Sequence, residues 1–100
     1  MPLFVVTYTH PDEAGWRLHV TPHVEYLNGL VERGVLRASG PFKDTPHRSA
    51  MLLFAAADRD ALMALIAEDP FAIEGLIEDM TVTEWDPIFG ALIADSSRAV

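Results

Sequence analysis

The order of patterned segments along these 100 residues restricts the fold more than any other feature. Runs rich in β-branched and aromatic residues predict four strands, and apolar residues at three- and four-residue spacing predict two helices. The predicted strands cover residues 3–9, 35–39, 49–56 and 78–85, and the predicted helices begin at Thr21 and after Asp58. The order is therefore strand, helix, strand, strand, helix, strand.

Proline and glycine mark the ends of these segments. Thr21-Pro22 predicts a helix start, because threonine can cap a free backbone N–H and proline at the first helical position loses no hydrogen bond. Gly34 is expected to end this helix. Asp69-Pro70 ends the second helix and precedes a short helical turn over residues 71–75. Residues 13–20 fit either a short helix or an ordered loop.

This order is the split βαβ pattern of a ferredoxin-like α+β fold, with a four-stranded antiparallel sheet and both helices on one face. We expect a single domain over residues 1–100, with a core at about 3–85 and a tail at 88–100. The run Met51 to Phe54 predicts a strand buried on both faces.

The sheet face without helices would then be too apolar for a monomer. A homodimer is therefore expected, and the alternative is a monomer whose tail crosses this face.

Composition restricts the partners. Fifteen acidic and seven basic residues give a net charge of −8, which opposes binding to nucleic acid. No apolar run approaches the roughly 18 residues of a membrane helix, and the start of the chain has no secretory pattern. There are no cysteines, so disulfides are excluded. A cytoplasmic location is the resulting expectation.

His23 is the first candidate for chemistry. After Pro22 it would lie in the first turn of a helix, where the helix dipole disfavours protonation, and a neutral imidazole can act as a general base. Asp69 is its candidate partner, since a carboxylate can orient an imidazole and stabilise its charged form. Each residue also has a structural explanation, as a half-buried histidine and as a helix N-cap. Sequence spacing does not show that the two meet.

The remaining candidates carry weaker signals. His19 and His23 are four residues apart, but the proline between them is expected to break the helix that this spacing needs, so no metal is predicted. His10 and His47 fall in predicted loops and are interpreted as solvent-facing or incidental. Ser39 has no nucleophile-elbow sequence around it, and glycine-rich nucleotide loops are absent, so no cofactor is predicted.

Three segments together resemble the YCII-related (YciI-like) family over about residues 3–85. They are His23-Val24-Glu25-Tyr26-Leu27 followed by Gly34, Ala38-Ser39-Gly40-Pro41-Phe42, and Asp69-Pro70-Phe71 followed by Gly75. The resemblance implies a ferredoxin-like protomer, a dimeric α/β barrel and a pocket between the sheet and the helices. It also implies a His-Asp pair, which falls on His23 and Asp69, with Ser39 and Tyr8 lining the pocket.

The resemblance leaves the substrate open. Such sequences often carry an arginine three positions before the histidine, where this chain has Val20, and Arg17 is the candidate substitute. One hypothesis is a cofactor-independent lyase or isomerase that binds a small molecule. The alternative is a non-catalytic ligand-binding or regulatory module, and an oxygenase on the same kind of barrel has less support because no axial-ligand motif is present.

Overall fold

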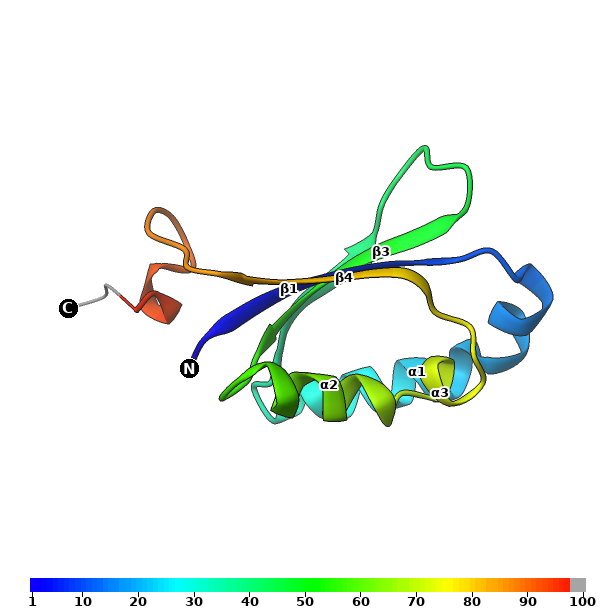
Figure 1. The fold of residues 1–100 in the computed structure, drawn as a ribbon, viewed down its shortest axis with the longest axis horizontal. Coiled ribbons are helices and arrows are strands. Elements are labelled where there is room, and N and C mark those ends of the chain that lie inside the picture. Colours follow the sequence, from blue (N-terminus) through cyan, green and yellow to red (C-terminus); the bar gives the residue numbers. More distant parts are fainter. Residues whose placement is uncertain (98–100) are drawn as a thin grey trace.

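The computed structural model describes residues 1–97, in which four strands form one antiparallel sheet. The strands are β1 (Leu3–His10), β2 (Leu36–Pro41), β3 (Arg48–Ala55) and β4 (Glu78–Trp85), and the helices are α1 (Glu13–Glu32), α2 (Arg59–Ala67), α3 (Pro70–Ile73) and the 3-10 turn η1 (Ile93–Asp95). The strand order is β2-β3-β1-β4, and α1, α2 and α3 lie together on one face (Figure 1). The predicted ferredoxin-like fold is confirmed.

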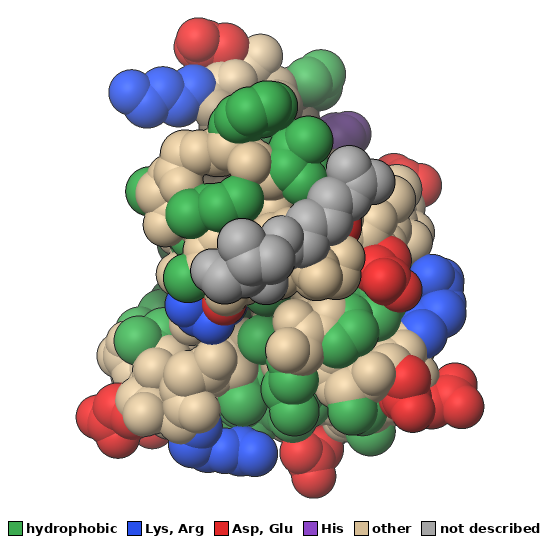
Figure 2. Space-filling view, turned by 90° about the vertical axis from the view of Figure 1, so that its left-hand side faces the viewer, with side chains coloured by type: hydrophobic (Ala, Val, Ile, Leu, Met, Phe, Trp, Pro, Cys, Tyr) green, Lys and Arg blue, Asp and Glu red, His purple; other side chains and the backbone are tan. Residues whose placement is uncertain are grey.

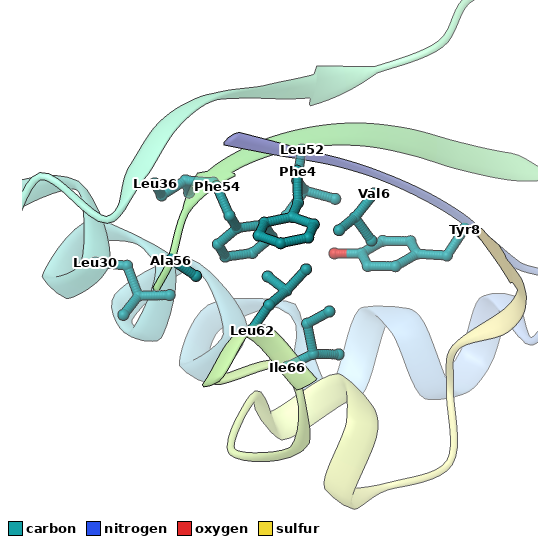
Figure 3. Close-up of a cluster of buried hydrophobic side chains, with 10 residues drawn as sticks. All are labelled: Phe4, Val6, Tyr8, Leu30, Leu36, Leu52, Phe54, Ala56, Leu62 and Ile66. Carbon is teal, nitrogen blue, oxygen red and sulfur yellow. The ribbon is translucent and has the colours of Figure 1, made fainter. Parts of the chain in front are cut away.

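Alternation along β1 and β3 builds the core between the sheet and the helices. Phe4, Val6 and Tyr8 of β1 point toward the helices, where they meet Leu62 and Ile66 of α2 (Figure 3). Each of these side chains is at least 94% buried. Because successive strand residues point to opposite faces, this register fixes which residues can reach a site on the helix side.

Helix α1 differs from the prediction. It is continuous from Glu13, its N-cap is Asp12 rather than Thr21, and Pro22 lies inside it. The Asp12 side chain accepts the Gly15 N–H at 3.0 Å, so a stronger cap starts the helix earlier. Proline inside a helix removes one backbone bond and bends the helix without necessarily ending it, and Figure 1 shows the first turns of α1 at an angle to the rest.

Two consequences follow from the continuous helix. His23 lies in its middle, so the predicted influence of a helix N-terminus on this imidazole is wrong. The start of α1 also packs closely against the segment before β4, since a Cβ at position 15 would lie 2.5 Å from Leu76 Cδ2. A larger residue at position 15 would therefore have to displace the side chains of Leu76 and Asp12.

The sheet face without helices is only partly covered. Leu3, Leu53 and Ala55 are buried there, and Leu92 of the C-terminal segment packs against them. Met51 is 43% exposed, so the prediction that its strand is buried on both faces is wrong at this residue. Residues 98–100 of the predicted tail lie outside the described residues. Within residues 1–97, no helix combines the length and apolarity that crossing a membrane requires.

Two helical leucines test where the core lies. Leu62 is fully buried, whereas Leu18 is 74% exposed. Leu62→Ala should lower the free energy of unfolding by about 2–5 kcal/mol, because it removes packed atoms and leaves a cavity. Leu18→Ala should change it by less than about 0.5 kcal/mol. Urea unfolding of both variants measures this, and equal losses would contradict the arrangement of the core.

Candidate functional site

A cavity of about 310 Å³ lies between α1 and the sheet. Its apolar wall includes Tyr8, Trp16, Val20, Val24, Phe42 and Phe71. Its polar side chains are His10, His23, Ser39, Arg48 and Ser49. The cavity thus combines aromatic and aliphatic surface with a few polar groups from α1, β1, β2 and β3, which is the usual composition of a small-molecule site.

His23 and Asp69 are in direct contact at this cavity. His23 Nδ1 lies 2.8 Å from Asp69 Oδ1 and 2.9 Å from Oδ2, and both residues are buried. The Asp69 side chain also caps α3 by accepting the Phe71 N–H at 2.9 Å. Asp69 therefore caps α3 and also contacts His23, the two positions that its place in the sequence suggested. A carboxylate accepts, so His23 Nδ1 carries the hydrogen.

The second ring nitrogen of His23 opens on the cavity. Phe71 stacks on the imidazole with the ring centroids 3.9 Å apart and the planes inclined by 15°. No hydrogen bond joins Nε2 to any of the residues described, and no unpaired side-chain nitrogen or oxygen among them is fully buried. Nε2 must therefore reach the cavity surface. With Nδ1–H fixed, Nε2 of the neutral ring carries a lone pair.

His10 was predicted to be solvent-facing or incidental, and this is wrong. It is the last residue of β1 and is only 4% exposed. Its Nδ1 lies 2.7 Å from the Leu76 carbonyl oxygen, and its ring leans against Tyr8 and Phe71 at centroid distances of 4.8 and 4.7 Å. The sequence did contain a signal for this burial. Alternate residues of the strand face inward, and the series Phe4, Val6, Tyr8 extends to His10 as the next inward position.

The tautomer of His10 follows from its partner. A carbonyl oxygen only accepts, so Nδ1 carries the hydrogen and Nε2 is a free acceptor, which opens on the cavity by the argument used for His23. Burial lowers the pKa of His10, and the nearby Arg48 guanidinium acts in the same direction. His10 is therefore a neutral imidazole near pH 7.

Tyr8 and Ser39, the predicted pocket residues, both line the cavity. Tyr8 is buried, and burial together with the negative charge of Asp69 raises its pKa, so the phenol stays protonated at physiological pH. Ser39 is exposed and lies on β2 opposite Leu52 of β3, at the edge of the cavity. The structure thus brings His23, Asp69 and Tyr8 together in the interior and leaves Ser39 at the rim.

The arginine at the cavity comes from an unexpected element. The Arg17 side chain is 75% exposed and lies 3.9 Å from Glu13, outside the cavity lining, so it does not substitute for the arginine missing at Val20. Arg48, at the start of β3, does line the cavity. Sequence inspection missed it because a position on one strand acquires neighbours only when the pairing register is known.

The histidines on α1 do not form a metal site with each other. Because α1 is continuous through Pro22, a helix break no longer argues against a site formed by His19 and His23. However, His19 Nε2 faces Glu74 at 3.8 Å, whereas His23 faces Asp69. Across residues 1–97, no three His, Asp or Glu side chains come close enough together to hold a metal ion.

Comparison with known proteins identifies the family of this chain. The family profile of the YCII-related domain matches residues 1–86. The chain belongs to the YCII-related family. No curated protein matches the sequence of this YCII-related chain.

Several solved structures resemble the YCII-related chain. The 5-chloro-2-hydroxyhydroquinone dehydrochlorinase TftG from Burkholderia phenoliruptrix AC1100, in complex with 2,5-dihydroxybenzoquinone, has a TM-score of 0.64 at 18% identity, covering 84% of this chain and 93% of TftG. A NIPSNAP domain protein from Burkholderia xenovorans scores 0.55 at 16% identity, covering 87% and 94%. An antibiotic biosynthesis monooxygenase scores 0.54 at 17%, covering 85% and 97%. At these identities the likeness establishes the shared fold.

The environment of His10 can be tested by its titration. In the folded chain, NMR should show the Nδ1–H tautomer and protonation at a lower pH than in the urea-unfolded chain, because burial lowers the pKa of His10. The unfolded chain then binds this proton first, so the free energy of unfolding falls as the pH drops through the ordinary histidine range toward the lower native pKa.

The matched variant is His10→Asn, whose amide can keep the bond to the Leu76 carbonyl but does not titrate. It should lose this part of the acid dependence of stability. Identical titration of His10 in the folded and unfolded chains would contradict its burial.

Proposed function

We propose that this YCII-related chain is a cofactor-independent enzyme of the lyase or isomerase type, in which His23 moves a proton and Asp69 holds its imidazole. The contact between buried Asp69 and His23 Nδ1 carries this proposal, because it leaves Nε2 as the basic atom at the surface of the cavity. A stacked Phe71 ring and the α3 cap hold both partners in place.

The chemistry follows from these positions. Nε2 takes a proton from a substrate carbon next to a carbonyl, whose electron pair then moves toward the carbonyl oxygen, or from an enol or phenol hydroxyl, whose electron pair moves into the adjacent double bond or ring. Asp69 stabilises the imidazolium that forms. In an isomerisation the imidazolium returns the proton to a different carbon, and in an elimination the electron pair expels a leaving group. Such acid–base help contributes about 10²–10⁴ in rate.

Cavity size and one solved neighbour support a small cyclic substrate. A volume of about 310 Å³ is at the low end for ligand sites, which suits a single ring. TftG, which shares the fold, is named for the elimination of chloride from a substituted hydroquinone. Elimination from a small oxygenated ring is accordingly the reaction we favour for this chain.

We also propose that two copies form a barrel by packing their helix-free sheet faces together. The register assigns uncharged side chains to the middle of this face: Leu3, Val5, Thr7, Ala38, Gly40, Met51, Leu53, Ala55, Thr81, Thr83 and Trp85. Two chains of net charge −8 repel each other, and this repulsion is weakest where they meet through an uncharged surface. The distribution of charge therefore favours a second copy as the partner that covers this face.

The shape of this face agrees with that occupant. A hollow of about 510 Å³ lies on it, lined by Val5, Met51, Leu53, Trp85 and Leu92 among others. Figure 2, which looks at the end where the C-terminal segment lies, shows hydrophobic side chains exposed in its upper half, on the side away from the helices, as well as in its lower half. Burial of this surface against its own copy would remove it from water.

Two substitutions of an exposed apolar residue by lysine test the dimer. Met51→Lys places a charge in the middle of the neutral face and should convert the dimer to a monomer in analytical ultracentrifugation. Leu18→Lys changes an equally apolar but helical position, 74% exposed, and should leave the dimer intact. A monomeric wild-type chain, or dissociation by Leu18→Lys alone, would count against this interface.

Replacement of His23 tests the proposed reaction. With 5-chloro-2-hydroxyhydroquinone, and with a panel of small cyclic ketones and lactones in D₂O, chloride release or deuterium incorporation should fall by about 10²–10⁴ in His23→Gln. Asp69→Asn should also slow the reaction while keeping the α3 cap, since asparagine caps as well as aspartate.

The control is His47→Gln, which alters an exposed loop histidine. Activity that survives in His23→Gln would overturn the proposed role. Binding without turnover, unchanged by His23→Gln, would instead favour the non-catalytic ligand-binding module.

A further inference from the structure

A second polar pair, His10 and Arg48, lies on the sheet wall of the cavity. The two residues are directly opposite in the antiparallel pairing of β1 and β3, and both line the cavity. Directly opposite residues have Cβ atoms about 4.5–5.5 Å apart and side chains on the same face. This pair belongs to the sheet, whereas His23 belongs to α1, and all three side chains line the same cavity.

The Arg48 side chain is fixed through its Nε, which leaves its Nη donors available. Its Nε lies 2.8 and 3.0 Å from the two carboxylate oxygens of Glu13, and its guanidinium carbon lies 3.7 Å from the centre of the Trp16 ring. The Nη groups have no hydrogen-bond partner within residues 1–97, and the side chain is 42% exposed. An always-charged guanidinium fixed by an ion pair and a ring is suited to an anionic or carbonyl oxygen.

His10 offers the opposite kind of atom. Its Nδ1–H is used by the Leu76 carbonyl, so the Nε2 at the cavity can only accept. Burial lowers the pKa of this imidazole, which keeps the acceptor unprotonated. A neutral acceptor next to a cationic donor matches a ligand that carries a hydroxyl beside an anionic oxygen.

We propose that His10 and Arg48 bind the two adjacent oxygens of a monoanionic enediol or catechol, with Arg48 on the oxyanion and His10 accepting the hydrogen of the neighbouring hydroxyl. This deepens the proposed function by naming its substrate class, and in that respect rests on it. The ring of such a ligand would lie against the apolar wall and present its carbon or hydroxyl to His23 Nε2. Glu13 and Asp69 are the anionic groups near the pair, and each is already engaged, by Arg48 and His23 respectively.

Coloured nitroaromatic probes can test each half of the pair by equilibrium binding, without turnover. The monoanion of 4-nitrocatechol has both oxygens, 4-nitrophenolate has only the oxyanion, and 4-nitroanisole has neither. The wild-type chain should bind them in that order of decreasing affinity. A charge-assisted hydrogen bond is expected to contribute roughly tenfold or more, and a neutral one roughly three- to tenfold.

Variants assign the two steps of affinity. Arg48→Gln should remove the preference for 4-nitrophenolate over 4-nitroanisole, and Arg48→Lys should retain part of it. His10→Asn, which can keep the bond to Leu76, should remove only the preference for 4-nitrocatechol over 4-nitrophenolate. Arg17→Gln is the control, because Arg17 also contacts Glu13 but lies outside the cavity.

The outcomes separate this inference from the proposed reaction. Three results would overturn the proposed binding of adjacent oxygens: equal affinity for the three probes, no binding of any probe, or unchanged preferences in Arg48→Gln and His10→Asn. Arg48 would then serve only to link α1 to β3. His23→Gln should still bind 4-nitrocatechol with the same preferences. If those preferences depend on Arg48 and His10 while His23→Gln retains full turnover, the pair is a binding site and the proposed reaction fails.

Discussion

The site depends on how the buried carboxylate of Asp69 is satisfied. A buried charge is costly unless it is hydrogen-bonded and paired, and Asp69, at 3% exposure, receives the Phe71 N–H and His23 Nδ1–H. The first bond is local and begins α3, whereas the second crosses to the middle of α1. One side chain therefore sets the position of a short helix, the orientation of an imidazole and, through Phe71, the packing of His10. Removal of the Asp69 carboxylate would therefore change the packing of His23 on one wall of the cavity and of His10 on the other.

The sheet separates two tasks by the alternation of its side chains. On the helix side β1 carries Phe4, Val6, Tyr8 and His10, which pass from hydrophobic core to cavity wall along a single strand. The opposite side is uncharged through its middle although the chain as a whole is strongly acidic. Charged and titratable groups thus lie on the helix side and at the edges, which leaves the other face suited to a second copy. A one-residue shift in register would exchange these faces and destroy both the core and the site.

Local pattern and order were enough to predict much of this architecture from the sequence. Strand composition and turn residues located all four strands, and the resemblance to the YCII-related family indicated that His23 and Asp69 belong together. The start of α1 could not be predicted correctly because Thr21-Pro22 and Asp12 are both possible caps, and the helix begins at the stronger one, Asp12, which accepts the Gly15 N–H. Arg48 could not be predicted for a related reason, since its place opposite His10 arises from strand pairing between segments far apart in the sequence.

Two imidazoles contact the same Phe71 ring, but their surroundings give them different chemistry. His23 Nδ1 lies against the Asp69 carboxylate, a contact that fixes the orientation of the imidazole. His10 has only a carbonyl on Nδ1 and a guanidinium nearby, and burial with that positive charge opposes its protonation. The two imidazoles at the cavity therefore differ in their partners, a carboxylate behind His23 and a backbone carbonyl behind His10. This difference in partners is the reason we assign proton transfer to His23 and ligand binding to His10 in the two proposals.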